Sequence, residues 1–427
     1  MSLTRRAFLG RSALIGCSAA ASPLLTPVSF AAAPWDTRLV VIVLRGAMDG
    51  LDVVQPYGDP KLTAWRPTFI PGPNGGAKDL DGFFSLNKAL KPLWPLWKSG
   101  ELGFVHAVST PYRDKRSHFE GQDLLEAGTT HLLDNRDGWL NRMLQVLPGV
   151  EPQTAFAIGH GEMRLLDGPA PVANWTPEVE LSLSPQAMQL AQVMMEDDPQ
   201  FHAAFTDAVM LSGGTLEIEP LNQETPADAV LDEDGNPLPG GMMAERQMMA
   251  EDTQAMGRKP RVSVYKDVAA FAAEQLRGPA RVASFSINGW DSHQRQEKVL
   301  TAALGNLSDV ILTLKSDLGP QIWGKTAVVA VTEFGRTVRE NGTVGTDHGT
   351  GGAMLMAGGA IRGGKVYGRW PGLAEADLYE GRDLMPTGDV RAPIGWIMRG
   401  LTGLSRSEIE SVVFPGLDMG KPMKILA

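Results

Sequence analysis

The sequence has almost no cysteine. Cys17 is the single cysteine among 427 residues, and it lies close to the N-terminus. The rest of the chain therefore has no pair of cysteines that could form a disulfide, and no thiolate to serve as a nucleophile or metal ligand. Whatever chemistry the protein performs must come from other side chains.

Basic residues are outnumbered by acidic ones. The chain has 39 lysines and arginines against 49 aspartates and glutamates, which gives a formal net charge of -10. Residues 1–33 contain three of the arginines and no acid, so their removal would change the charge to -13, from -10 - 3. An acidic surface repels polyanions, so we expect no nucleic-acid partner.

Long apolar runs are also absent beyond the N-terminal segment, so we expect no transmembrane segment in the mature chain. Residues 4–9 (TRRAFL) match a twin-arginine export signal, and the following apolar stretch ends in AAA at 31–33. We expect residues 1–33 to be a cleaved signal peptide, recognised by the twin-arginine translocase. The location would be periplasmic or secreted. Residues 14–17 (LIGC) leave open a lipoprotein tethered through Cys17.

The remaining residues 34–427 are expected to form one α/β domain. Four apolar runs of strand length occur, at 38–44, at 102–108, at 281–287 and from 326 to Glu333. Helical patterns cover 117–127, 136–146, 184–211, 262–276 and 293–314. This alternation predicts a mostly parallel central sheet with helices on both faces. Residues 216–260 form an insertion whose acidic, proline-rich part, 222–240, is expected to be mobile, with a helix at 242–256.

Metal-ligand residue types follow each strand-like run. Asp49 follows the first run, Ser117 the second, Asp291 and His293 the third, and His348 comes one loop after Glu333. Functional residues of open α/β sheets collect at the carboxyl ends of the strands, so these side chains should converge. Carboxylates and imidazoles together are suitable ligands for one or two divalent cations.

Ser117 starts a helical pattern, so its hydroxyl is expected at a helix N-terminus, where a phosphate group is stabilised. Arg113 and Arg116 precede it and add positive charge for an anionic group. The simpler interpretation of Ser117 is a helix N-cap, and both roles can hold together.

Five motifs carry a resemblance to an exported family, the domain of unknown function 1501. They are 44–51 (LRGAMDGL), 112–120 (YRDKRSHFE), 289–293 (GWDSH), 332–337 (TEFGRT) and 345–351 (GTDHGTG). Members of this family resemble the alkaline phosphatase and sulfatase superfamily, so the resemblance implies an alkaline phosphatase-like domain. It implies metal ligands at Asp49, Asp291, His293, Glu333 and His348, and a nucleophile at Ser117.

Five further residues within these motifs are expected to contact the substrate or support the ligands: Arg113, Arg116, His118, Arg336 and Asp347. Phe334 departs from the superfamily pattern, which has a metal-binding histidine there, so one metal position is altered or empty. The sequence also lacks the formylglycine motif of sulfatases, since Phe119 and Gly121 follow Ser117 where that motif has proline and arginine.

The sequence therefore predicts a periplasmic, metal-dependent hydrolase of a small anionic ester, most of all a phosphoester. One or two cations, zinc, manganese, magnesium or calcium, would assist either the Ser117 nucleophile or a metal-bound hydroxide. The alternative is a catalytically degenerate member of the family that acts as a binding or assembly protein.

Overall fold

A computed structural model describes residues 35–113, 116–131, 137–158, 163–175 and 264–427. The expected signal segment, the expected helix at 184–211 and the insertion at 216–260 with its methionine-rich helix all lie outside these ranges.

A nine-stranded sheet runs through the described part of the chain, in the order β11-β5-β10-β9-β1-β8-β6-β7, with β12 also pairing with β5. Strand β1 (Arg38–Arg45) lies in the middle, parallel to β8 (Val282–Asn288) and β9 (Thr326–Val331). Beyond β8 follow β6 (Ala155–Ile158) and β7 (Ala173–Trp175), both parallel to it. These strands are short, apolar and covered on both faces, as in parallel sheets generally.

One strand runs against the rest. β10 (Gly352–Ala357) is antiparallel to β9 on one side and to β5 (Leu102–Ser109) on the other. Because β10 is antiparallel to both of its neighbours, β5 runs in the same direction as β9 and β1. The short strands β11 (Val366–Tyr367) and β12 (Gly388–Asp389) are parallel to β5. The residues that follow β1, β5, β8 and β9 therefore lie at one edge of the sheet.

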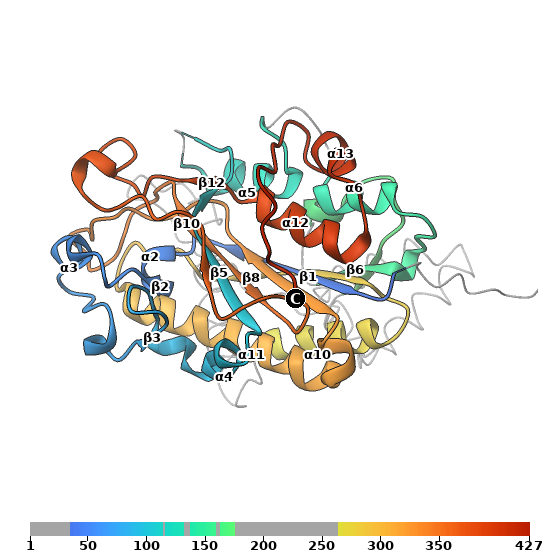
Figure 1. The fold of residues 1–427 in the computed structure, drawn as a ribbon, viewed down its shortest axis with the longest axis horizontal. Helices are drawn as coiled ribbons and strands as arrows, with labels where there is room; N and C mark the ends of the chain where they lie inside the picture. Colours follow the sequence, from blue (N-terminus) through green and yellow to red (C-terminus); the bar gives the residue numbers. More distant parts are fainter. Residues whose placement is uncertain (1–34, 114–115, 132–136, 159–162, 176–263) are drawn as a thin grey trace, which may run out of the picture.

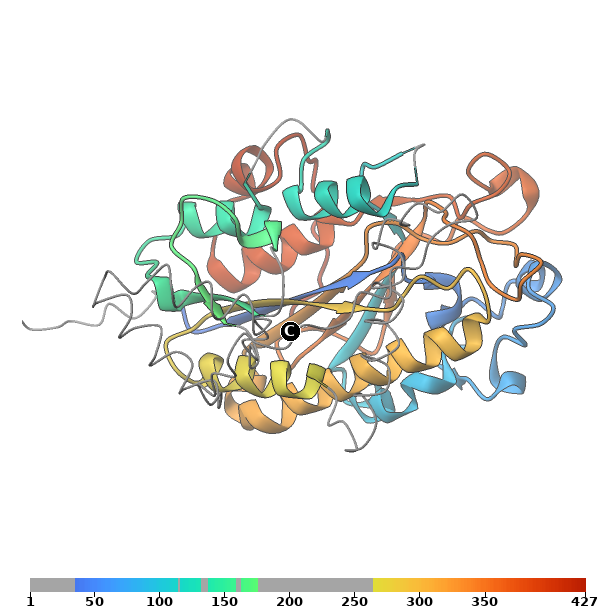
Figure 2. The same ribbon diagram turned by 180° about the vertical axis from the view of Figure 1, so that it is seen from behind.

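Helices cover both faces, which gives three layers (Figures 1 and 2). Helices α4 (Trp94–Lys98), α10 (Val264–Arg277) and α11 (Gln296–Trp323) lie on one face, and α5 (His118–Ala127), α6 (Trp139–Val146), α12 (Arg391–Thr402) and α13 (Arg406–Glu408) lie on the other.

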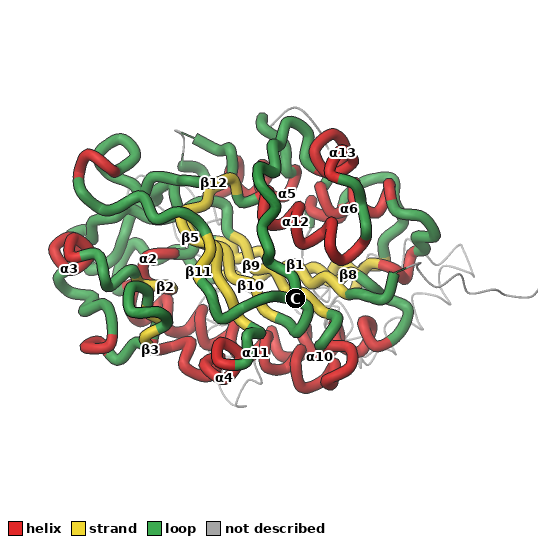
Figure 3. The backbone as a smooth tube through the Cα atoms, in the orientation of Figure 1, coloured by secondary structure: helices red, strands yellow, loops and turns green. Residues whose placement is uncertain are grey.

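Smaller elements complete the described part. Two short helices, α2 (Gly50–Val53) and α3 (Pro60–Trp65), follow β1. A small antiparallel sheet, which lies beside β5 of the large one (Figure 3), contains β2 (Val54–Gln55), β4 (Ser85–Leu86) and β3 (Lys78–Asp79). Further helical turns are η1 (Pro73–Gly75), η2 (Lys88–Leu93), η3 (Pro152–Thr154), η4 (Arg164–Leu166), η5 (Glu375–Asp377) and η6 (Ile409–Val413).

The α/β class, the mostly parallel sheet and the helices on both faces agree with the sequence-based prediction. The four predicted strands correspond to β1, β5, β8 and β9, and four of the predicted helices correspond to α5, α6, α10 and α11. Helix α11 is longer than predicted and is interrupted near its end at Gly319, where a φ of 66° and the following Pro320 break the helical pattern. The antiparallel direction of β10 was not predicted, because a buried apolar strand has the same composition in either direction.

None of the helices within the described ranges is both long and apolar enough to cross a bilayer.

His106 is a titratable group buried inside β5. Its side chain packs against the rings of Phe84 and Trp370. Its Nε2 donates to the carbonyl of Val54 at 3.0 Å, and its Nδ1 accepts from the amide of Ala107 at 2.9 Å. Burial disfavours the charged form and lowers the pKa of His106 from 6.5 to about 4. The folded protein therefore holds a neutral imidazole here.

This depressed pKa predicts a loss of stability in mild acid. Above pH 6.5 the ring is neutral in both the folded and the unfolded state. Below pH 6.5 the unfolded chain binds a proton at His106, whereas the folded chain binds it only below about pH 4. Between these values His106 should remove roughly 3 kcal/mol from the free energy of unfolding. Urea denaturation at several pH values, compared with His106→Gln, measures this difference. Parallel pH profiles for the two proteins would contradict it.

Candidate functional site

Two imidazoles and a carboxylate meet at the carboxyl edge of the sheet. Ligand atoms of His118, Asp291 and His348 all lie within 4.8 Å of one another. The Nε2 atoms of His118 and His348 are each 3.6 Å from the carboxylate of Asp291, one on either oxygen. These residues come from three different segments, the start of α5, the loop after β8 and the loop before β10.

A third imidazole belongs to the same group. The Nε2 of His293 lies 3.3 Å from Asp291 Oδ1 and 2.9 Å from the Nε2 of His348. Three Nε2 atoms are thus directed at one carboxylate. We call His118, Asp291, His293 and His348 the three-histidine cluster.

Each imidazole of the cluster is oriented by an oxygen acceptor behind it. The Nδ1 of His118 donates to Glu333 Oε1 at 2.8 Å, and that of His293 donates to Asp347 Oδ1 at 3.0 Å. The Nδ1 of His348 donates to the carbonyl of Arg116 at 2.9 Å. Because these oxygens only accept, the neutral form of each ring carries its lone pair on Nε2. This pattern is typical of metal-binding histidines.

The arrangement within the cluster is unfavourable for neutral rings alone. With both protons on Nδ1, His293 and His348 point lone pairs at each other across 2.9 Å. The Nε2 of His118 is buried and has no hydrogen-bond partner. A tetrahedral zinc site with nitrogen ligands has neighbouring nitrogens about 3.3 Å apart. The residues of the cluster therefore fit a divalent cation, which would satisfy all three lone pairs.

The charge states of His348 and Asp291 are suited to a cation, whereas at His118 a proton competes with it. Burial, together with the nearby His118 and Arg336, lowers the pKa of His348 from 6.5 to about 4 and keeps it neutral at physiological pH. For Asp291, burial acts to raise the pKa, but Arg336 outweighs it and lowers the pKa below its usual value. The hydrogen bond to Glu333 is the main cause that raises the pKa of His118.

Close backbone contacts hold the loops of the cluster in place. Gly46 has a φ of 121°, and a Cβ there would lie 2.6 Å from the amide nitrogen of Asp291. A Cβ on Gly345 would lie 2.2 Å from the carbonyl oxygen of His293. Only glycine permits both approaches. Arg116 adopts a φ of 52°, and this left-handed backbone presents its carbonyl to His348.

Glu333 is fully buried behind His118. Its Oε1 accepts from His118, from the amide of Gly46 at 2.9 Å and from Gln122 Nε2 at 3.1 Å, and its Oε2 accepts from Thr332 at 2.9 Å. Burial acts to raise the pKa of Glu333, but these hydrogen bonds outweigh it and lower the pKa. Both oxygens of the Glu333 carboxylate thus already accept hydrogen bonds from the protein.

Phe334 fills the space beside the histidines. Its ring stacks on His118 with centroids 5.2 Å apart, and its centroid is 5.1 Å from that of His348. The residue is buried. An apolar ring therefore stands where the resemblance implied a metal ligand.

Asp49 lies in a different environment from the cluster. Its fully buried carboxylate forms a two-pronged ion pair with Arg66, at 2.6 and 3.1 Å, and accepts from Gln296 Nε2 at 2.6 Å. Its Oδ1 also caps α2 by accepting from the amide of Leu51. These donors engage both oxygens, and Asp49 is not among the grouped ligand atoms within the described ranges.

Ser117 caps helix α5, as the sequence predicts. Its Oγ accepts from the amide of Glu120 at 3.5 Å, a long hydrogen bond, and its own amide donates to the hydroxyl of Tyr112 at 2.8 Å. The next residue is His118, so the hydroxyl and a cluster imidazole share the first turn of one helix.

The predicted arginines have separate positions. Buried Arg336 donates to Asp291 Oδ1 at 2.9 Å. Arg113 donates to the carbonyls of Thr110 and Tyr112. Arg116 is more loosely held, 3.5 Å from Asp383 and 3.6 Å from Glu380.

The cluster is open to solvent. The side chains of Asp291 and His293 are 48% and 42% exposed. Structural zinc sites are closed, whereas catalytic sites keep a position for water or substrate. The exposure of the cluster favours the second kind.

Three supporting residues were not predicted from the sequence. Gln122 supports Glu333, Arg66 neutralises Asp49, and Gln296 links Asp49 to the loops that follow β8 and β9. Gln296 lies three residues after His293, which is the only local signal for it. Nothing near Arg66 in the sequence indicates its partner.

Sequence comparison relates the chain to one protein family. The family model described as "Protein of unknown function (DUF1501)" matches residues 116–395, a range that contains all four residues of the three-histidine cluster. No curated protein matches the chain.

Solved structures show a distant likeness. The alkaline phosphatase of the Antarctic bacterium TAB5 is 12% identical, with a TM-score of 0.31 over 76% of this chain and 92% of that chain. A mutant of the TAB5 enzyme with Mg bound in its M3 site is 11% identical, also with a TM-score of 0.31, over 78% of this chain and 94% of that one. A 2-O GAG sulfatase is 11% identical, with a TM-score of 0.28 over 78% and 66%. At TM-scores this low, the likeness says nothing about the chemistry of the site.

The hydrogen bond behind His118 predicts a change in metal affinity. Glu333→Gln preserves the shape of the side chain but removes the charge that orients the imidazole. If the cluster binds a divalent cation, we expect the substitution to weaken that binding by about 10- to 100-fold while the fold is retained. Competition titration with a zinc-sensitive dye measures the affinity, with His131→Ala as the control for an exposed histidine outside the cluster. Equal affinities for Glu333→Gln and wild type would contradict the orienting role.

Proposed function

The chain belongs to the DUF1501 family of proteins of unknown function, and we propose that this member is a metal-dependent hydrolase of small anionic esters, most of all phosphoesters. The observation that carries the proposal is the solvent-open three-histidine cluster with its unpartnered, buried Nε2 on His118. A bound divalent cation would act as a Lewis acid on water and on an ester oxygen.

The ligands proposed for this cation are His118, Asp291, His293 and His348. Glu333 and Asp347 would orient two of the imidazoles rather than bind the ion themselves. Three imidazoles and one carboxylate favour zinc over magnesium or calcium, which prefer oxygen ligands.

A single ion is proposed instead of two. Only one group of ligand atoms converges within the described residues. Phe334 occupies the space beside it with an apolar ring, and the carboxylate of Asp49 is held by Arg66.

The chain's own residues would hold and attack the substrate. Arg116 is loosely paired and one third exposed, so its guanidinium can turn toward an anionic group. Ser117 holds only a long capping hydrogen bond at the start of α5, where the helix dipole stabilises negative charge. Its hydroxyl is the proposed nucleophile, with water as the other candidate.

The alternative function is that of a binding or assembly protein. The packing of Phe334 against His118 favours it, since an apolar ring stands beside the imidazoles. From the N-terminal sequence alone, we also propose that the protein is exported through the twin-arginine route and works outside the cytoplasm, which cell fractionation tests.

The hydrolase proposal predicts metal-dependent activity. Zinc-loaded protein should hydrolyse an aryl phosphoester such as p-nitrophenyl phosphate, and a chelator should abolish the reaction reversibly. His348→Ala should lower kcat/KM by at least about 100-fold together with metal content, because a ligand is lost. His131→Ala should match wild type. Stoichiometric zinc without hydrolysis of any phosphate or sulfate ester would favour the binding-protein alternative.

A second prediction separates the two candidate nucleophiles. If Ser117 attacks the substrate, Ser117→Ala should lower kcat by at least ~10⁴-fold and leave zinc binding intact. Its free energy of unfolding should fall by about 1 kcal/mol or less, the value of an N-cap. Ser405→Ala removes a comparable cap from α13 and serves as the control for stability. Activity of Ser117→Ala within about tenfold of wild type would assign the attack to water.

A further inference from the structure

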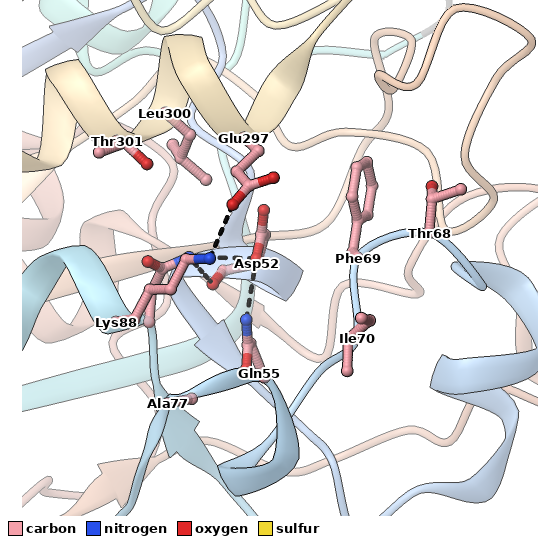
Figure 4. Close-up of a pocket in the computed structure, with 12 residues that line it drawn as sticks. Asp52, Gln55, Thr68, Phe69, Ile70, Ala77, Lys88, Glu297, Leu300 and Thr301 are labelled. Atoms are coloured by element: carbon pink, nitrogen blue, oxygen red, sulfur yellow. Dashed lines mark hydrogen bonds and ion pairs between the residues drawn. The ribbon is translucent and has the colours of Figure 1, made fainter.

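A cavity of about 100 Å³ lies beside the start of α11 (Figure 4), and no residue of the three-histidine cluster lines it. The loop from Thr68 to Ala77 forms one wall, and Glu297, Leu300 and Thr301 of α11 form another. Asp52 also lines it. None of these residues has a part in the proposed hydrolysis.

Asp52 is a buried carboxylate held only by amides. Its Oδ1 accepts from Gln55 Nε2 at 2.9 Å and from Asn87 Nδ2 at 3.1 Å. Its Oδ2 accepts from Gln296 Nε2 at 3.1 Å. Its side chain has no ion pair with a cationic residue in the described part of the chain.

The nearby cations are already paired with other carboxylates, Lys88 with Glu297 and Arg66 with Asp49. Both terminal nitrogens of Arg66 donate to Asp49, at 2.6 and 3.1 Å. The guanidinium of Arg66 therefore compensates the negative charge of Asp49. The charge of Asp52, which lines the cavity, has no such partner. Burial raises the pKa of Asp52, and repulsion from Asp49 adds to this. A buried charge without a counterion is unfavourable, so a cation in the cavity would stabilise this group.

The rest of the cavity is suited to a short carbon chain and a second polar contact. Phe69, Ile70 and Leu300 supply apolar surface, and exposed Glu297 adds a carboxylate at the rim, where it is paired with Lys88 at 2.7 Å. Ile70 is 59% exposed and has a φ of 42°, a strained conformation for a β-branched residue. Strain of this kind is concentrated at ligand sites.

We propose that this cavity binds a small organic cation with N–H donors, an alkylammonium or a guanidinium, with its charged end on Asp52 and its carbon part against Phe69 and Leu300. A cavity of ~150 Å³ holds benzene, so this one accommodates roughly four non-hydrogen atoms, and the end of a longer carbon chain would extend toward the rim. The site is independent of the proposed hydrolysis, and its test does not use enzyme activity.

Isothermal titration of the full-length protein with n-butylammonium chloride, at constant ionic strength, tests the proposal. We expect saturable binding of one equivalent. n-Butanol has the same carbon chain without the charge, and calcium chloride has the charge without N–H donors, so neither should displace the amine.

Three variants locate the binding. Asp52→Asn keeps the size of the side chain and should weaken binding at least tenfold. Thr301→Trp adds a large side chain at an exposed rim position and should block the cavity without touching the buried network. Glu274→Gln removes an exposed charge from α10 and should bind as wild type does, which controls for net charge.

The proposal is overturned if n-butylammonium shows no saturable binding, or if n-butanol or calcium displaces it. Wild-type affinity in both Asp52→Asn and Thr301→Trp would also overturn it. If Asp52→Asn does not fold, Thr301→Trp decides the question alone.

Discussion

A continuous hydrogen-bond network beneath the carboxyl edge of the sheet joins the loops that carry the candidate site. Asp291 accepts from Arg336, whose Nε donates to Thr346, and Thr346 donates to Gln296. Gln296 in turn donates to Asp49, which Arg66 neutralises. Every member other than Asp291 is buried, so each needs its partner. The loops after β1, β8 and β9 are therefore fixed relative to one another by charge and hydrogen bonding.

This network explains why the histidines can face one another without direct support from the core. Their rings lie at the surface of the network, and each is oriented by an oxygen behind it. A cation would complete an arrangement that three neutral imidazoles leave unfavourable. The site is thus pre-organised, because the buried hydrogen bonds below the rings stabilise the fold enough to hold the nitrogens close together.

The side chain of Gln296 connects the cavity with the three-histidine cluster. The amide nitrogen of Gln296 donates to both Asp49 and Asp52, and its amide oxygen accepts from Ser292 and Thr346. Ser292 lies between two residues of the three-histidine cluster. The cavity and the cluster therefore share a structural element, although each has its own ligand chemistry.

The α/β class, the positions of four strands and the edge at which polar residues gather could be predicted from the sequence, because apolar periodicity and strand length follow from local composition. The sequence also identified Asp291, His293 and His348 as neighbours, since they follow strands that run in one direction. The position of His118 in the cluster with Glu333 behind it, and the pairing of Asp49 with Arg66, became visible only in the folded chain. Those assignments depend on which side chains meet across loops, and local sequence carries no information about such distant partners. The antiparallel direction of β10 was decided in the same way, by the packing of a strand whose composition fits either direction.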